Sequence, residues 1–340
     1  MKRTLLTLLQ ATVTILLLWW IFRDPAKNRA MAEALRQAEW IWLFLGVGAV
    51  GMACLLQTQR WSILLSVQGI SLGWWRTLRV YMIGMFFNLF LLGSTGGDVV
   101  KIYYAMRETA TRKGAAFLSV LVDRMMGLLG LVAVALIVVT LRWSALATKA
   151  PAELVALGII MGGMLAAVAV GFFVDRFNLS DRIPKKLPMH GRIVEFASAF
   201  SLYARDGKAL AATFGLSVTA HLFNFLAFYC AARALHEFSG PTGLVDSFSV
   251  MPIIMTITSL PISLSGVGVR EALFEKLFYS LFGTPQAIAV MISVAGFMMI
   301  VFWGLVGGIT YLFYRPTGGL HLKEMREEVD SVEEGIENPS

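Results

Sequence analysis

Apolar residues occur along the chain in runs long enough to cross a lipid bilayer. A helix needs about 20 mainly apolar residues to span the hydrocarbon core of a membrane. Six runs approach or exceed this length and predict full spans at Leu5–Phe22, Trp40–Gln59, Ala116–Leu141, Ala152–Val174, Ala209–Ala232 and Gln286–Phe313. The polar segments between them are short, so the pattern predicts an all-α polytopic membrane protein whose integral membrane domain covers residues 1–314.

Two further apolar segments, at about 78–106 and 247–282, are interrupted by glycine and serine. Both interruptions contain a serine, a glycine three positions later and a cation four positions beyond that, at Ser94, Gly97 and Lys101 and again at Ser263, Gly266 and Arg270. Non-helical backbone at membrane depth is tolerated only where protein or water satisfies its polar groups. Paired breaks of this kind are typical of transporter sites, and they predict two re-entrant helical hairpins.

The distribution of Lys and Arg favours the re-entrant interpretation of these two segments. If both segments turn back, most basic residues lie on one side, which the positive-inside rule assigns to the cytoplasm together with both termini. If both crossed, the basic loops at 101–113 and 175–208 would move to the other side. Three full spans then separate the breaks, which predicts an inverted repeat of six transmembrane helices plus two hairpins. We expect a multi-pass protein of a bacterial or archaeal cytoplasmic (inner) membrane.

Composition excludes several classes of function. Hydrophobic residues make up 57% of the 340 positions, and the net charge of +7 belongs to loops at the membrane surface, so we expect no nucleic-acid partner. Cys54 and Cys230 lie in apolar runs as packing residues. No metal or nucleotide motif occurs, and we therefore predict no cofactor. The acidic segment 315–340 is predicted to be a disordered cytoplasmic tail.

The first break places charged residues where a helix is expected to begin. Asp98 is predicted to be the N-cap of that helix. If the N-terminus of the helix faces a cavity, its dipole favours an anionic headgroup, and Lys101 adds a direct phosphate contact. The alternative is that Lys101 extends to the cytoplasmic interface as a topology anchor.

Charges also lie inside the predicted spans. Asp123 and Arg124 lie within the third span, where ionisable side chains are functional candidates by default, although a structural ion pair that braces the first hairpin is an alternative. At the second break, Arg270 suits bidentate phosphate binding. Its neighbour Glu271 is expected to lie on a different helix face, where it pairs with another cation, carries a proton or is solvated.

The residues around both breaks carry a family resemblance. The run Phe86–Lys101, followed by Leu121–Gly127, resembles the first signature of the lysylphosphatidylglycerol synthase transmembrane-region family, and Leu260–Glu271 is similar to its later signature. The resemblance implies a flippase-like membrane domain without the soluble aminoacyl-transfer domain of the bifunctional members. Where family members often have Leu-Pro-Gly, this chain has Leu92, Gly93 and Ser94, so glycine alone is expected to shape the first turn.

Together these features predict a flippase or transporter that moves an anionic phospholipid or lipid-linked headgroup, with membrane lipids as its partners. Two alternatives remain open: an intramembrane lipid-modifying enzyme, and a scaffold for a separate lipid synthase or glycosyltransferase. The absence of a recognisable catalytic constellation argues against an enzyme. The predicted substrate-binding residues are Asn88, Ser94, Gly97, Asp98, Lys101, Asp123, Arg124, Ser263, Gly266, Arg270 and Glu271.

Overall fold

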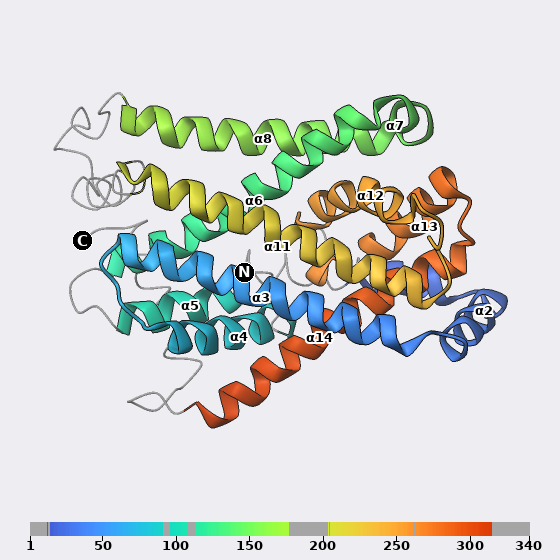
Figure 1. Cartoon of the computed structure of the whole chain (residues 1–340), viewed down its shortest axis with the longest axis horizontal. Coiled ribbons are helices and arrows are strands. Elements are labelled where there is room, and N and C mark those ends of the chain that lie inside the picture. The colour runs from blue at the N-terminus through green and yellow to red at the C-terminus, as the bar shows by residue number, and fades with distance from the viewer. Residues whose placement is uncertain are drawn as a thin grey trace.

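The structure is a computed structural model that describes residues 12, 14–90, 96–107, 113–176, 203, 205–260 and 263–314. Every regular element in these ranges is a helix, which confirms the all-α prediction. Four helices are long and apolar enough to cross a membrane: α3 (Trp40–Val67), α6 (Lys113–Leu141), α11 (Gly207–Ala234) and α14 (Gln286–Phe313). They run along the long axis of the molecule (Figure 1).

The other two predicted spans differ from these four. The span predicted at 152–174 lies in α8 (Pro151–Arg176), which is joined to the short α7 (Trp143–Lys149) at a bend of 114°. The described part of the predicted first span is helical over residues 14–22, and the rest of that span lies outside the described residues. The chain then continues into α2 (Pro25–Arg36), where the side chain of Asp24 caps the helix by accepting a hydrogen bond from the Ala26 N–H.

Helix α3 is longer than predicted, and its extension matters for the candidate site. The sequence predicts that this span ends at about Gln59 and that Arg60 belongs to the basic cytoplasmic loop at 60–79. In the structure the helix continues to Val67, since Trp61, Leu64 and Leu65 are almost completely buried and extend its packed face. Arg60 is therefore a buried residue of the helix, and its assignment to a loop was wrong.

Each predicted broken segment consists of two helices. The first contains α4 (Trp74–Phe90) and α5 (Gly96–Arg107), and the second contains α12 (Gly243–Thr258), the 3₁₀ turn η1 (Leu264–Gly266) and α13 (Val269–Phe282). We call α4–α5 the first hairpin and α12–α13 the second hairpin. Figure 1 shows the first hairpin in the left half of the bundle and the second in the right half. The two hairpins therefore approach the middle from opposite ends.

The two hairpins turn in different ways. In the first, α4 and α5 touch through their backbones, because a Cβ atom on Gly97 would lie only 1.9 Å from the carbonyl oxygen of Gly84. Small residues allow this close approach between helices at membrane depth. In the second, the turn uses positive φ angles, including 75° at Gly266 and 51° at Ser265. Glycine adopts this conformation without penalty, whereas Ser265 is strained there.

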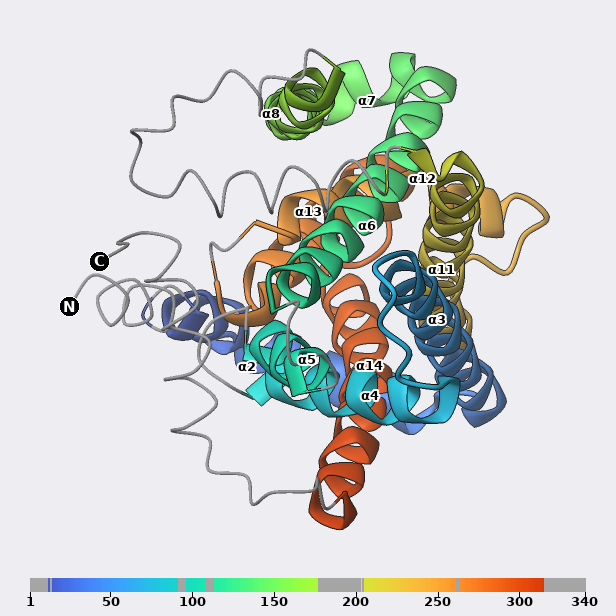
Figure 2. The ribbon, with the colours of Figure 1, turned by 90° about the vertical axis from the view of Figure 1, so that its left-hand side faces the viewer.

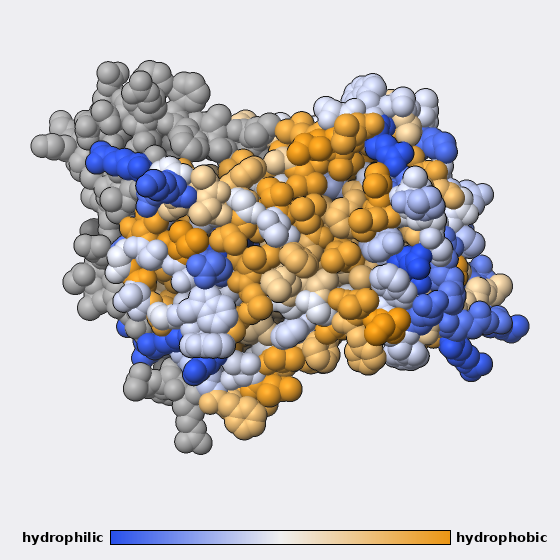
Figure 3. Space-filling view, viewed as in Figure 1, coloured by the Kyte–Doolittle hydropathy of each residue, from blue (hydrophilic) through white to orange (hydrophobic). Residues whose placement is uncertain are grey.

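The outer surface of the bundle is apolar across its middle. In Figure 3 a broad band of hydrophobic residues lies between polar residues that gather toward the two ends. Large exposed apolar side chains include Ile41 and Phe44 on α3 and Phe302 and Ile309 on α14. A continuous apolar surface of this extent is unfavourable in water and suits contact with lipid. Viewed along the bundle, α8 lies at the outside, whereas α14 starts in the interior and its last turns project beyond the other helices (Figure 2).

Candidate functional site

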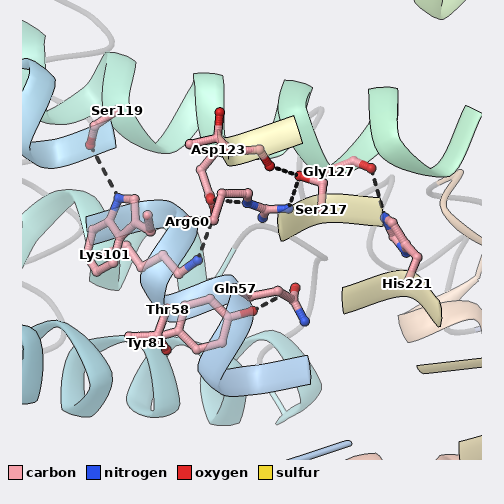
Figure 4. Close-up of polar contacts among 12 residues, drawn as sticks. Gln57, Thr58, Arg60, Tyr81, Lys101, Ser119, Asp123, Gly127, Ser217 and His221 are labelled. Atoms are coloured by element: carbon pink, nitrogen blue, oxygen red, sulfur yellow. Dashed lines mark hydrogen bonds and ion pairs between the residues drawn. The ribbon is translucent and has the colours of Figure 1, made fainter. Parts of the chain in front are cut away.

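Three charged side chains meet in the interior of the bundle. Arg60 on α3 donates to the Oδ1 atom of Asp123 on α6 at 2.7 Å, and the Nζ atom of Lys101 on α5 lies 3.4 Å from Oδ2 of the same carboxylate. The exposed fractions of the three residues are 5%, 3% and 6%. Figure 4 shows both cations pointing toward Asp123. We call these three residues the charge cluster.

Other side chains hold the two cations in place. The Nζ atom of Lys101 lies over the ring of Tyr81 at 4.1 Å from its centroid and over the ring of Trp61 at 5.3 Å. Such cation–π contacts are strongest where water is excluded. Arg60 also donates to the hydroxyl of Ser217 on α11 at 3.1 Å. The cluster thus connects α3, α5, α6 and α11, with α4 contributing an aromatic wall.

The charges of the cluster do not cancel. Two cations share one carboxylate, and the nearby carboxylate Asp98 already pairs with Arg124. Isolated buried charges cost several kcal/mol unless they are paired and hydrogen-bonded. With Arg60 and Lys101 both protonated, the cluster carries a formal excess of one positive charge among the described residues, which an incoming anion would neutralise.

The other predicted residues of the first hairpin brace its turn. The side-chain oxygen of Asn88 accepts a hydrogen bond from the Gly97 N–H at 2.9 Å, which joins the end of α4 to the start of α5. Asp98 forms an ion pair with Arg124 of α6. Because α5 begins at Gly96, Asp98 lies in its first turn, so its prediction as the N-cap was wrong. Ser94 lies outside the described residues.

Asp123 and Arg124 do not pair with each other. Asp123 is buried and pairs with Arg60 and Lys101, whereas the Arg124 side chain is 43% exposed and pairs with Asp98. The pair of Asp123 with Lys101 and the pair of Arg124 with Asp98 both join α6 to α5. The predicted alternative of a brace on the first hairpin therefore has two separate ion pairs to support it, rather than one pair between sequence neighbours.

The second hairpin contains a charge pair of its own. Arg270 donates to Oε1 of Glu271 at 2.9 Å and also contacts the hydroxyl of Ser293 on α14 at 3.2 Å. Glu271 accepts a hydrogen bond from the Gly268 N–H at 2.6 Å, which caps the first turn of α13. We expected the two adjacent charges to lie on different helix faces and not to meet. That expectation was wrong, because both long side chains turn toward Ser293.

The turn of the second hairpin contacts the end of α4 in the first hairpin. The hydroxyl of Ser265 in η1 donates to the main-chain carbonyl of Asn88 at 3.3 Å. Nearby Ser263 is buried, and within the described ranges its hydroxyl has no hydrogen-bond partner. The structure thus joins the two breaks through Asn88 and Ser265. Lys101 and Arg270, the two predicted phosphate contacts, do not meet. Lys101 pairs with Asp123, and Arg270 pairs with Glu271.

Sequence reasoning missed three residues of the cluster region, namely Arg60, Trp61 and Tyr81. The signal for Arg60 was the apolar periodicity that continues after it at Trp61, Leu64 and Leu65. On α11, His221 contacts the carbonyl of Gly127 at 2.8 Å, and Asn224 donates to the carbonyl of Ala220 within its own helix. His221 therefore makes an interhelical hydrogen bond next to the cluster.

The family of the chain follows from a comparison with family models. The model described as the lysylphosphatidylglycerol synthase TM region matches residues 7–308. The chain belongs to this family. The matched range contains the charge cluster, both hairpins, the long apolar helices α3, α6 and α11, and most of α14, so this lysylphosphatidylglycerol synthase TM-region protein is a multi-pass membrane protein. A comparison with curated proteins finds no match.

Proposed function

We propose that this protein moves an anionic phospholipid or a lipid-linked anionic headgroup across the cytoplasmic membrane. The observation that carries the proposal is the charge cluster, in which Arg60 and Lys101 share the single carboxylate of Asp123. A phosphate group would supply the second negative charge.

The arrangement of the hairpins supports a transport cycle. We interpret both as re-entrant segments that enter the membrane from opposite sides, and the turn of the second meets the end of α4 through Ser265 and Asn88. Inverted repeats with a site between them are a recurrent basis of alternating access, in which one half moves against the other. A lipid headgroup bound near the contact could then be exposed to either leaflet in turn.

Asp123 has a clear task in this cycle. Without a substrate, the attraction of both buried cations to its carboxylate offsets the repulsion between them. With a phosphate present, Lys101 can change partner, because it is held by a 3.4 Å ion pair and by aromatic rings, whereas Arg60 makes the shorter contact of 2.7 Å. We therefore assign Lys101 as the cation that contacts the phosphate and Arg60 as the cation that keeps Asp123 in place.

Lipid translocation in proteoliposomes tests this assignment. We expect Lys101→Gln to slow translocation of phosphatidylglycerol about tenfold or more, because a charge-assisted hydrogen bond is worth about 1.5 to 3 kcal/mol. Translocation of a lipid without net charge should change much less. Lys276→Gln is the matched control, since this lysine is 57% exposed and pairs with Glu153 away from the cluster. Equal rates for wild type and Lys101→Gln would overturn the proposal.

The orientation of the chain can be tested separately. We expect Arg107, at the end of α5, to face the cytoplasm, and Lys149 and Lys276 to face the opposite side. Arg192, which we also place in the cytoplasm, lies outside the described residues. Single cysteines at these positions, in a background without Cys54 and Cys230, should react accordingly with an impermeant thiol reagent. External labelling at position 107 would contradict the re-entrant arrangement of the first hairpin.

A further inference from the structure

A groove on the outer surface lies apart from the charge cluster. It has a volume of about 390 Å³ and lies between α3, α4 and α14, which pack side by side (Figure 2). Its lining is almost entirely apolar and includes Gly48, Leu55, Met82, Trp303 and Val306. Ligand pockets commonly have volumes of about 300 to 1,000 Å³. The groove is therefore large enough to receive a ligand group.

Two glycines of α3 shape this groove. A Cβ atom added at Gly48 would meet nothing within 4 Å, so this position leaves open space. A Cβ atom at Gly51 would lie 2.5 Å from the ring of Trp303, so the ring closes the groove there. The indole N–H of Trp303 donates to the carbonyl of Val47 at 2.8 Å, which fixes the ring as a wall.

One end of the groove is basic. Arg79 on α4 belongs to the lining and is exposed, and it pairs with no carboxylate among the residues that the structure describes. Its guanidinium lies 6.0 Å from the ring centroid of Tyr314, whose hydroxyl accepts a hydrogen bond from Arg76 at 3.0 Å. Two arginines therefore flank Tyr314 next to an apolar groove.

The position of the groove identifies its occupant. Its lining includes the exposed apolar residues Met52 and Leu55, which suit contact with the hydrocarbon of a membrane. A molecule that reaches it from the bilayer is a lipid. Basic residues between transmembrane helices recognise anionic headgroups. We propose that the groove binds one anionic phospholipid of the surrounding leaflet, with an acyl chain between α3 and α14 and the phosphate at Arg79.

This lipid site does not depend on the proposed transport function. Lys101 of α5 and Asp123 of α6 lie outside the lining of the groove. The lipid would remain bound as a structural component that fills the space between α3, α4 and α14. A protein that translocates nothing could still bind it, and a transporter could lack it, so the two proposals can fail separately.

Native mass spectrometry of the purified full chain tests the site, with phosphatidylglycerol and phosphatidylcholine of identical acyl chains as probes. A Cβ atom at position 48 meets nothing within 4 Å, so Gly48→Leu should extend into the open space and lower the occupancy of both lipids about tenfold, with Gly48→Ala in between. Gly215→Leu on α11 is the matched control, because its Cβ atom also meets nothing within 4 Å. Occupancy in Gly48→Leu equal to that of the control would overturn the site.

The headgroup contact is tested with a second pair of variants. Arg79→Gln should weaken phosphatidylglycerol binding more than phosphatidylcholine binding and so remove the preference, because both lipids have a phosphate but only phosphatidylcholine carries a compensating cation. Arg29→Gln on α2 should alter neither. Thermal unfolding in the same detergent shows whether each variant is folded. If Gly48→Leu is unfolded, Gly48→Ala and Arg79→Gln decide the question. An unchanged preference in Arg79→Gln would contradict the proposed phosphate contact.

Discussion

The two hairpins share the same spacing of serine, glycine and cation, but their cations are neutralised in different ways. Lys101 of the first hairpin reaches Asp123 on a separate helix and shares it with Arg60. Arg270 of the second hairpin pairs with Glu271, its neighbour in the sequence. The spacing therefore does not produce two equivalent half-sites. The first hairpin belongs to a network with excess positive charge, whereas the pair in the second hairpin is neutral.

This difference assigns separate roles to the two cations. An anion near the first hairpin gains attraction from an excess charge, but near the second it must compete with Glu271 for Arg270. Glu271 is also held by the Gly268 N–H and the Ser293 hydroxyl, so displacing it would break several hydrogen bonds. We therefore expect Arg270 to act in packing and Lys101 to act in substrate binding, although the sequence predicts the same role for both.

The largest effect on stability is expected for Asp123→Asn. This change leaves two cations, Arg60 and Lys101, buried without a carboxylate, and breaking a buried ion pair in this way costs about 3 to 5 kcal/mol. Reversible unfolding in detergent measures the loss. Asp98→Asn is the matched control, because its partner Arg124 is 43% exposed and such pairs contribute less than about 1 kcal/mol. Equal losses in the two variants would show that the cluster is not a desolvated ion pair.

The second prediction compares the two cations directly. Arg270→Met leaves Glu271 buried without a cation and should cost about 3 kcal/mol, near the lower limit for a broken buried pair because two hydrogen bonds remain. Lys101→Met leaves the neutral pair of Arg60 and Asp123 and should cost about 1 kcal/mol or less. Reversible unfolding in detergent measures the loss of stability in both variants. A larger loss in Lys101→Met would reverse the proposed assignment of roles.

The sequence predicts most of the architecture because helix boundaries follow local chemistry. The span predicted at 286–313 has the bounds of α14, and that predicted at 209–232 lies within two residues of α11 at each end. The second break coincides with its glycine and serine run, whereas residues 91–95 of the first run lie outside the described residues. The end of α3 was missed because a charge after an apolar run is typical of a loop, and only the folded chain shows that Asp123 compensates Arg60.

The candidate site is less predictable for a related reason. Lys101, Asp123, Arg270 and Glu271 stand out in the sequence as charges in apolar surroundings. Their pairing depends on how each helix is rotated and shifted against its neighbours, and sequence spacing along one helix does not determine this. The contact between Asn88 and Ser265 is of the same kind, because it joins two segments far apart in the chain.

The third prediction compares the two turns. Gly97→Ala would place a Cβ atom 1.9 Å from the Gly84 carbonyl oxygen, so α4 and α5 must separate, at a cost of about 1 to 3 kcal/mol. Gly266→Ala meets its nearest atom at 3.2 Å, and its cost of about 1 to 2 kcal/mol arises mainly from the positive φ angle. Because Lys101 follows Gly97 on α5, only the first variant should also displace this side chain and slow lipid translocation.

The smallest effect concerns the contact between the hairpins. Ser265→Ala removes the hydrogen bond to the Asn88 carbonyl and keeps the strained φ angle of 51°, so unfolding should become about 0.5 to 1.5 kcal/mol easier. Ser265→Gly removes the same hydrogen bond but relieves the strain, and it should be about 1 kcal/mol more stable than Ser265→Ala. If the contact couples the two hairpins during transport, both variants should slow lipid translocation equally despite their different stabilities. Rates that instead follow stability would show that the contact serves folding alone.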